Sequence, residues 1–334
     1  MTEQELATKT VASLVADATA APSMHNAQPW RFRFVTGERL LVLRADPSRA
    51  MPRSDPDNRA LHIGCGAALF NLRVAAAHAG LSPRVRLQPD ADDPMVLAAV
   101  RLPDSDADVG AGAVEADLVR LYPAINRRHT SRYPFEDKEL PEDVRDTLRA
   151  AAAQEGADLL FPGLWHVETV LDLVRDAESR DALDPAGTED LRRWTRLGPE
   201  ADIATDGVPE YAFGPRRRDG RAPLRDFAGR RPVADRGTVS FESSPHLALL
   251  ATPGDTPTDW LRAGQALERV LLEATSAGLA GSLTSHPLES RDLRTLARDP
   301  VAGRGPVQMV LRLGYGPQGP ATPRRPVRDV LDVT

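Results

Sequence analysis

Cysteine is almost missing from this chain of 334 residues, which has Cys65 and no other. A single thiol cannot form an intrachain disulfide, and it excludes a CxxC redox pair and a zinc site built on cysteine ligands. The seven histidines show neither an HExxH motif nor paired spacing, so we expect no metal site. Cys65 lies between Gly64 and Gly66, which favours a small buried packing residue over a nucleophile.

Lysine is scarce in this chain, and long apolar runs and a positive net charge are missing. Lysine supplies only two of the 42 basic residues, so arginine is abundant everywhere and one arginine alone is weak evidence for a site. The formal net charge of −6 argues against binding of duplex nucleic acid through overall charge. No stretch approaches the roughly 18 apolar residues of a membrane span, and residues 1–10 lack the pattern of a signal peptide. We therefore expect a cytoplasmic protein that binds neither nucleic acid nor membrane.

Both halves of the chain show the pattern of a small α+β unit. In the first half, apolar residues at helical spacing precede Pro22, and alternating residues around a Thr-Gly-Glu turn predict a β-hairpin. The elements predicted there are a helix over 3–21, strands over 30–34 and 40–43, a helix over 57–79, a strand over 96–102 and a linker over 103–113. In the second half they are helices over 141–153 and 259–277 and strands over 246–252 and 307–313. We expect one face of the last strand to be wetter, because Gln308 and Arg312 alternate with apolar residues.

The two long helices can be aligned on each other. Gly66 and Gly80 bracket one of them, Gly264 and Gly278 bracket the other, and both separations are fourteen residues. Chance similarity between two alanine-rich helices is an alternative, but the flanking elements also match, which favours a tandem duplication.

Such a duplication predicts one half over 1–120 and another over 121–334. Residues 176–240 do not fit the repeat: they are rich in Arg, Asp, Pro and Gly, yet they also contain several aromatic residues. An excursion of this length in a compact domain is usually a lid, an arm or a binding loop. The basic run over 216–218 would suit a nucleic-acid binder, against which the charge balance argues.

Two polar segments carry candidate chemistry. Ser23, His25, Asn26 and Gln28 lie between a predicted helix and a predicted strand, and they can both donate and accept hydrogen bonds, which suits a neutral heteroaromatic ring. An ordinary polar turn is the alternative. In the segment 127–135, guanidinium groups flank a hydroxyl just before a helix, which suits a phosphate, although a solvated basic loop has the same composition.

Both segments resemble known motifs. The pattern Pro-Ser-x-x-Asn-x-Gln-Pro-Trp over 22–30 resembles the flavin-contacting motif of the nitroreductase superfamily, and Arg-x-Thr-x-Arg over 128–132 resembles the element that grips the flavin phosphate. Each half has one of these motifs and lacks the other, since 151–156 stands where the first motif should recur. This matches the fused-pair, Acg-type branch of actinobacteria. The resemblance implies an α+β nitroreductase-like fold, internally duplicated so that one chain mimics the family homodimer, with 176–240 as an inserted lid.

The resemblance also implies a single composite site for FMN, with no catalytic side chain. Ser23 and Asn26 would hydrogen-bond the ring or the ribityl chain. The implied cofactor-binding residues are Pro22, Ser23, Met24, Asn26, Arg128, Thr130, Arg132, Leu283, Thr284, Ser285, Arg324 and Arg325.

The implied activity is that of an FMN-binding oxidoreductase, which passes electrons from NAD(P)H or another donor to a nitroaromatic compound, a quinone or a similar small aromatic acceptor. If residues 176–240 cover the flavin, the alternative is a lidded protein that sequesters or stores FMN and has little NAD(P)H-dependent activity. The chain would be a monomer acting as a pseudo-dimer, or a homodimer.

Overall fold

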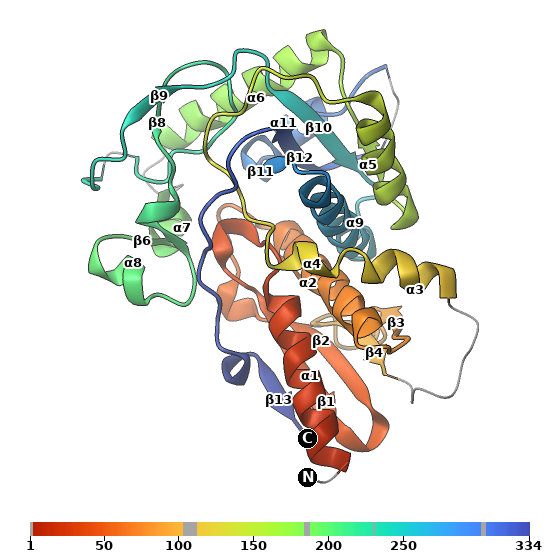
Figure 1. Ribbon diagram of the computed structural model, residues 1–334. Helices are drawn as coiled ribbons and strands as arrows, with labels where there is room; N and C mark the ends of the chain where they lie inside the picture. Colours follow the sequence, from red (N-terminus) through yellow and green to blue (C-terminus); the bar gives the residue numbers. More distant parts are fainter. Residues whose placement is uncertain (1–2, 103–111, 184–187, 230, 302–304) are drawn as a thin grey trace.

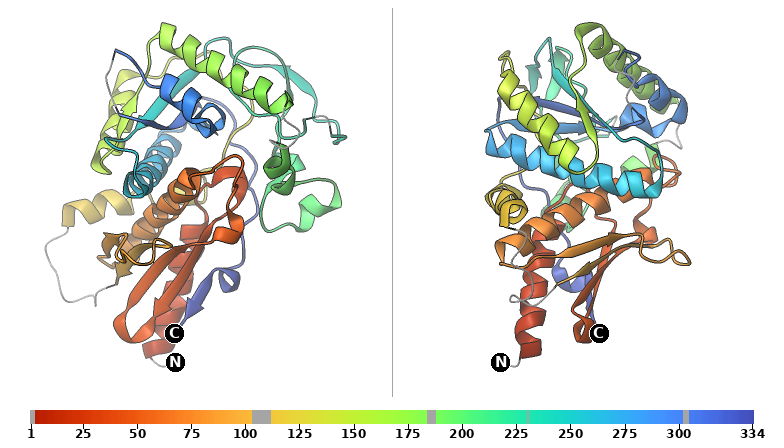
Figure 2. Two further views of the ribbon diagram at one scale, coloured as in Figure 1. Left: turned by 180° about the vertical axis from the view of Figure 1, so that it is seen from behind. Right: turned by 90° about the vertical axis from the view of Figure 1, so that its right-hand side faces the viewer.

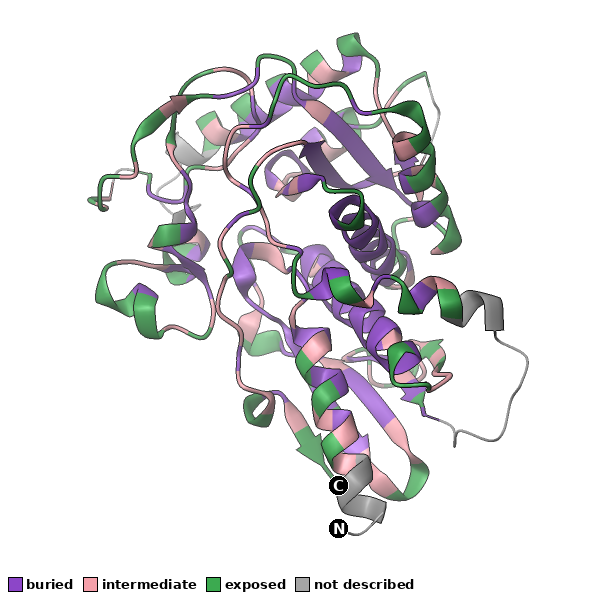
Figure 3. Cartoon of the chain, in the orientation of Figure 1, coloured by how far each residue is buried: buried purple, intermediate pink, exposed green. Residues whose placement is uncertain are grey.

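The computed structural model describes residues 3–102, 112–183, 188–229, 231–301 and 305–334. Two sheets enclose two long central helices, α2 (Arg59–His78) and α9 (Pro257–Ser276), and this α+β arrangement of layers is visible in Figures 1 and 2. Both helices are buried over most of their length, as Figure 3 shows by colour. The site described below lies between the two halves.

The first sheet has the strand order β13-β1-β2-β4-β3. Its predicted hairpin is confirmed, with Trp30 paired to Ala45 and Val35 paired to Leu40. Alternate residues of β1 point into the core, where α1 and α2 pack on the sheet. The bounds are α1 (Glu3–Thr19), β1 (Trp30–Val35), β2 (Leu40–Ala45), β3 (Arg84–Leu87), β4 (Val96–Arg101) and β13 (Leu331–Val333). Because β13 pairs with β1 in parallel, the C-terminal segment returns from the second half to the first.

The second sheet has the order β11-β12-β10-β5 and is antiparallel throughout. Helices α5 and α9 cover one of its faces, while α6, α10 and α11 cover the other. A capping box formed by Thr256 and Asp259 begins α9. The bounds are α5 (Glu142–Gln154), β5 (Asp158–Leu160), α6 (Leu164–Leu183), β10 (His246–Ala251), β11 (Ala280–Thr284), α10 (His286–Glu289), α11 (Arg291–Leu296) and β12 (Val307–Gly314).

The prediction of a wetter face on β12 is wrong. All of its residues are buried, including Gln308 and Arg312. Helices cover both faces of this sheet, so the polar side chains find partners inside the protein: Arg312 pairs with Glu242, and the Gln308 amide donates to Thr252. Alternation in the sequence therefore marks internal polar contacts here and does not mark a solvated face.

The central helices touch backbone to backbone. A Cβ atom placed on Gly264 would lie 2.1 Å from the Ile63 carbonyl oxygen, and one placed on Gly66 would lie 2.3 Å from the Leu261 carbonyl oxygen. The crossing therefore requires a residue without a side chain on each helix. These two glycines are the ones that align in the sequence comparison of the halves.

The expectation that no stretch has the composition of a membrane span is wrong for α2. This helix is long and apolar enough to cross a membrane, with a mean hydropathy of 1.3 over 18 residues, but 94% of that window is buried inside the protein. A central core helix accounts for such a composition.

Residues 188–240, called the 188–240 segment below, form short elements beside the two halves (Figure 1). They have a small apolar cluster of their own, which includes Phe213 and Phe227. The irregular region begins later than the expected residue 176, because α6 continues to Leu183 and packs Ala177 on the second sheet. The remaining elements are α3 (Gly112–Val119), α4 (Tyr122–Ile125), α7 (Thr188–Arg193), β6 (Thr195–Arg196), α8 (Pro199–Ile203), β7 (Val208–Pro209), β8 (Arg216–Asp219) and β9 (Thr238–Ser240). Most of the expected 103–113 linker lies outside the described residues.

Candidate functional site

A cavity of about 120 Å³ lies where the two halves and the 188–240 segment meet. Asn26 and Arg128, which come from different halves of the chain, both line it. So do Pro22, Ser23, Met24, Thr130, Arg132, Leu283, Thr284, Ser285 and Arg324, which makes eleven of the twelve predicted residues. Ile63, Leu267 and Met309 add apolar wall between the polar groups.

The motif after α1 has an unusual backbone. His25, Asn26 and Gln28 have φ values of 48°, 55° and 53°, in the left-handed region that residues other than glycine rarely adopt. Asparagine tolerates this conformation better than most residues. The turn is held by the backbone N–H of Gln28, which donates to the Ser23 hydroxyl oxygen at 2.9 Å. Such strain persists only where surrounding contacts enforce it, and it concentrates at functional sites.

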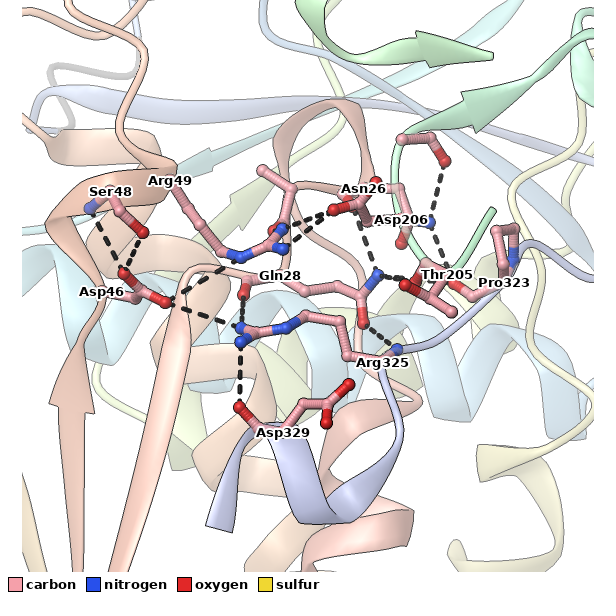
Figure 4. A network of polar contacts seen from close by, with 12 residues as sticks. Asn26, Gln28, Asp46, Ser48, Arg49, Thr205, Asp206, Pro323, Arg325 and Asp329 are labelled. Carbon is pink, nitrogen blue, oxygen red and sulfur yellow. Dashed lines mark hydrogen bonds and ion pairs between the residues drawn. The ribbon is translucent and has the colours of Figure 1, made fainter. Parts of the chain in front are cut away.

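The Asn26 side chain is already occupied by protein contacts. Its amide nitrogen donates to the carbonyl oxygens of Gly207 (2.9 Å) and Pro323 (3.0 Å), and its oxygen accepts from Arg324 at 3.0 Å. Asn26 therefore joins the motif to the 188–240 segment and to the C-terminal segment, and both of its donors are used (Figure 4). Ser23 differs, because its hydroxyl oxygen accepts from Gln28 and its proton remains available to a ligand.

The cavity is positively charged, and its cations form two groups. Arg128 and Arg324 lie together with His129: desolvation lowers the pKa of Arg324 to about 9, and the charge of Arg128 contributes to that shift. Arg132 lies apart from them, with its guanidinium group 4.7 Å from the Phe227 ring centre. Desolvation lowers the pKa of Arg132 to about 10, so both guanidinium groups remain charged at neutral pH. The described residues that line the cavity include no carboxylate.

Arg325 does not reach the cavity, contrary to its predicted place in the site. Its guanidinium group donates to the carbonyl oxygens of Gln28 (3.3 Å) and Asp329 (3.0 Å) and lies 3.6 Å from the Asp46 carboxylate (Figure 4). Successive side chains of an extended segment point in opposite directions, so Arg324 faces the cavity while Arg325 joins the C-terminal segment to β1.

Curated relatives cover nearly the whole chain, although no family model matches it. A Mycobacterium tuberculosis (strain ATCC 25618 / H37Rv) protein named "Putative NAD(P)H nitroreductase Rv3131" is 31% identical over 329 residues, which are 97% of this chain and 91% of the relative. The "Putative NAD(P)H nitroreductase acg" of the same strain is 29% identical over 347 residues, covering 100% and 98% of the two chains. The chain belongs to the Acg-type branch of the nitroreductase superfamily.

Solved structures show a more distant likeness. A nitroreductase from Anabaena variabilis has a TM-score of 0.44 at 12% identity and covers 84% of this chain and 70% of that one. The nitroreductase NfnB from Mycobacterium smegmatis, solved with NADPH, has a TM-score of 0.34 at 18% identity and covers 61% and 89% of the two chains. At this distance the likeness transfers no ligand to the Acg-type chain.

The cavity of this Acg-type protein also contains residues outside the predicted set. Ser282 is buried, and its hydroxyl has no hydrogen-bond partner among the described residues, which suggests that it binds a ligand. His25 packs edge-on against Phe227 at 5.5 Å; burial lowers its pKa well below 6.5 and Arg225 lowers it further, so His25 is neutral at pH 7. Alternation along β11 could have identified Ser282, because Ser282 and Thr284 share a face.

The 188–240 segment closes one side of the cavity with Val208, Leu224, Arg225 and Phe227. Arg225 donates to both oxygens of Glu289, at 2.8 and 3.0 Å, and the Thr284 hydroxyl donates to Pro223 at 2.6 Å. A second cavity of about 510 Å³ is lined mostly by the same segment and shares Leu224, Arg225 and His286 with the first. In the sequence, only the aromatic residues of this segment pointed to contacts with the site. The individual contacts depend on how the segment folds back, which no local pattern predicts.

Proposed function

We propose that the chain binds FMN in the cavity lined by Asn26 and Arg128 and acts as a flavin-dependent oxidoreductase of the nitroreductase type. The observation that carries this proposal is the meeting of Arg128, Arg132 and Arg324, without a carboxylate in the lining, at the strained 22–28 motif. A ligand with one anionic end and a flat polar ring fits two separate groups of cations joined by an apolar wall.

The proposed arrangement gives each residue a task. Arg128 would bind the phosphate directly, and Arg324, whose N–H groups already donate to protein acceptors, would add positive charge beside it. Arg132 would face the ring oxygens from the other side of the cavity. The hydroxyls of Ser23 and Ser282 would donate to the ligand, while Ile63 and Leu267 would exclude water from it. When bound, the flavin supplies the hydride and electron chemistry, and the protein supplies orientation and electrostatics. We propose NAD(P)H as the donor and a nitroaromatic compound or a quinone as the acceptor, since the names of the relatives point to this class.

We also propose that the chain arose by duplication and retains one site. The 151–156 region stands where the first motif would recur, and Glu155 there pairs with Arg73 at 2.6 Å and with Arg269 at 2.8 Å. In this proposal, the ion-pair network stands in place of the first motif in the second half, so that half retains no binding segment of its own. The reciprocal contact of Gly66 and Gly264 supports the same origin.

Titration of the apo-protein with FMN tests this proposal. We expect a yellow complex that saturates at one equivalent per chain, followed by flavin absorbance and by fluorescence quenching. A colourless protein that binds no FMN would overturn the proposed function, and saturation at two equivalents would overturn the single-site proposal.

A second candidate function follows from the cover over the cavity. Arg225 and Phe227 of the 188–240 segment form part of its wall, which favours retention of FMN as well as its use. Anaerobic mixing of the FMN complex with NADPH separates the two functions. Fast bleaching of the flavin absorbance supports the reductase, whereas no bleaching until the 188–240 segment is removed supports sequestration.

A further inference from the structure

A carboxylate lies directly behind the proposed phosphate end of the cavity. Glu268 of α9 is fully buried, and it follows Leu267, which lines the cavity. Its Oε1 atom is 3.4 Å from Nε of Arg128, whose side chain is only 5% exposed. Arg324 is close enough to influence Glu268 electrostatically. Two cations and one carboxylate therefore meet at this end, which leaves one positive charge in excess.

The contact between Glu268 and Arg128 is incomplete. Among the described residues, neither oxygen of Glu268 makes a hydrogen bond of good geometry, nor does Nε of Arg128, although the Asn71 amide lies close enough to lower the pKa of Glu268. The N–H groups of Arg324 donate to backbone carbonyls, including those of Thr19 (2.7 Å) and Ala20 (2.9 Å), and not to Glu268. A buried carboxylate without hydrogen bonds is costly, so this arrangement is poised to change when an anion arrives.

We propose that Glu268 is an internal counter-ion that competes with the ligand's phosphate for Arg128 and takes up a proton when the phosphate binds. This inference rests on the proposed function only for the identity of the ligand. A phosphate beside Arg128 and Arg324 brings a like charge near the carboxylate, and like charges disfavour ionisation. Protonation of Glu268 removes that repulsion and leaves the guanidinium group of Arg128 to the ligand.

The surroundings of Glu268 are suited to this exchange. Burial raises its pKa above the ordinary value, while Arg128, the Asn71 amide and Arg324 act in the opposite direction. His129, the other titratable group near the two arginines, has a pKa lowered first by burial and then by Arg128 and Arg324. His129 is therefore neutral near pH 7 in the free protein, so it is a second group that could take up a proton when an anion binds. Glu268→Gln separates the two, because it removes the proton uptake only if Glu268 is the acceptor.

The test compares FMN with riboflavin, which lacks the phosphate, on the wild type and on Glu268→Gln. Affinities are measured by quenching of flavin fluorescence between about pH 7 and 8.5, above the second pKa of the phosphate (about 6), so that the charge of the ligand stays nearly constant. Over this range one coupled proton changes affinity by at most about tenfold per pH unit. We expect wild-type affinity for FMN to fall as pH rises. Near the upper limit of this pH range, we expect Glu268→Gln to bind FMN about tenfold more tightly than the wild type. The affinity of Glu268→Gln for FMN should not fall as pH rises. The affinity of both proteins for riboflavin should change little with pH.

Glu273→Gln is the matched control, because Glu273 is a buried carboxylate of the same helix that pairs with Arg120 away from the cavity. It should retain the wild-type pH profile. Identical FMN profiles for Glu268→Gln and the wild type would overturn the proposal, and so would an equal gain of Glu268→Gln for riboflavin and FMN.

Two further measurements keep the test decisive. If Glu268→Gln does not fold, calorimetry of the wild type and of His129→Gln above pH 7, in buffers of different ionisation enthalpy, should show proton uptake with FMN and none with riboflavin. Absence of uptake by either protein overturns the proposal. If FMN does not bind, the proposed function fails, and inorganic phosphate then replaces it as the probe. Greater thermal stabilisation of Glu268→Gln than of the wild type by phosphate supports the counter-ion, and equal stabilisation refutes it.

Discussion

Replacing Arg225 by alanine should loosen the cover over the cavity. The Arg225 guanidinium group binds both oxygens of Glu289 and lies 3.2 Å from Nε2 of His25. It therefore ties the 188–240 segment to α10 and to the strained motif at once. Its side chain and that of Glu289 are each 13% exposed, so water screens the pair only in part.

The size of the effect follows from this partial burial. Exposed ion pairs contribute about 0–1 kcal/mol, and removal of one partner from a buried pair costs about 3–5 kcal/mol. The Arg225–Glu289 pair lies between these limits, so we expect a loss of about 2 kcal/mol. That loss shifts the equilibrium between covered and uncovered cavity by about 30-fold.

Release of bound FMN, followed by recovery of flavin fluorescence, measures this shift. Arg225→Ala should release FMN about 30-fold faster than the wild type. Arg221→Ala is the control, because Arg221 belongs to the same segment but pairs with Glu168 on the surface, where the side chains are 37% and 50% exposed. Wild-type release by a folded Arg225→Ala protein would refute the role of this pair. Loss of the Arg225 charge should also raise the pKa of His25, which NMR titration can detect.

Two further predictions concern stability. Gly264→Ala places a Cβ atom 2.1 Å from the backbone oxygen of Ile63, where no side-chain rotation can relieve the clash; we expect destabilisation by about 3 kcal/mol in urea unfolding, whereas Gly37→Ala, with open space around it, should change little. An unchanged midpoint for Gly264→Ala would contradict the close helix crossing. Burial alone would raise the pKa of Asp206, but hydrogen bonds from Arg49 and Arg196 bring it below 3.8, so its carboxylate stabilises the fold above about pH 4 and this contribution is lost as pH falls through the lowered pKa. Asp206→Asn should therefore be less stable than the wild type at neutral pH, with a difference that narrows in acid; a difference independent of pH would show that the charge is not responsible.

Local patterns were the most dependable part of the sequence. The hairpin, the long helices and the main strands lie close to their predicted positions, because apolar periodicity and residues such as Pro22 and Gly80 act over a few neighbours. Periodicity was less informative for β12. The pattern showed that Gln308 and Arg312 are polar, but it could not show that Glu242 and Thr252, which lie outside helices, would be their partners inside the protein.

The sequence predicted which residues lie at the candidate site better than it predicted which contacts each of them makes. Eleven of the twelve residues that the motifs selected line one cavity, since each motif is a short segment whose side chains lie close together; that they bind FMN stays a prediction. Asn26 was predicted to hydrogen-bond the ring or the ribityl chain, and such a contact stays a prediction. In the structure its amide nitrogen donates to Gly207 and Pro323. No local pattern could show this, as Asn26 is 181 positions from Gly207 and 297 from Pro323.

The sequence by itself determined which segments become helices and strands, which short motifs carry polar chemistry, and that the chain belongs with the nitroreductases, because these properties depend on residues that are near one another in the chain. Only the tertiary structure decided that Arg324 and not Arg325 faces the cavity, that the 188–240 segment contributes to its wall, and that Glu268 lies behind Arg128. These outcomes depend on chain direction, on burial and on contacts between distant segments, and those quantities are fixed only when the two halves pack together.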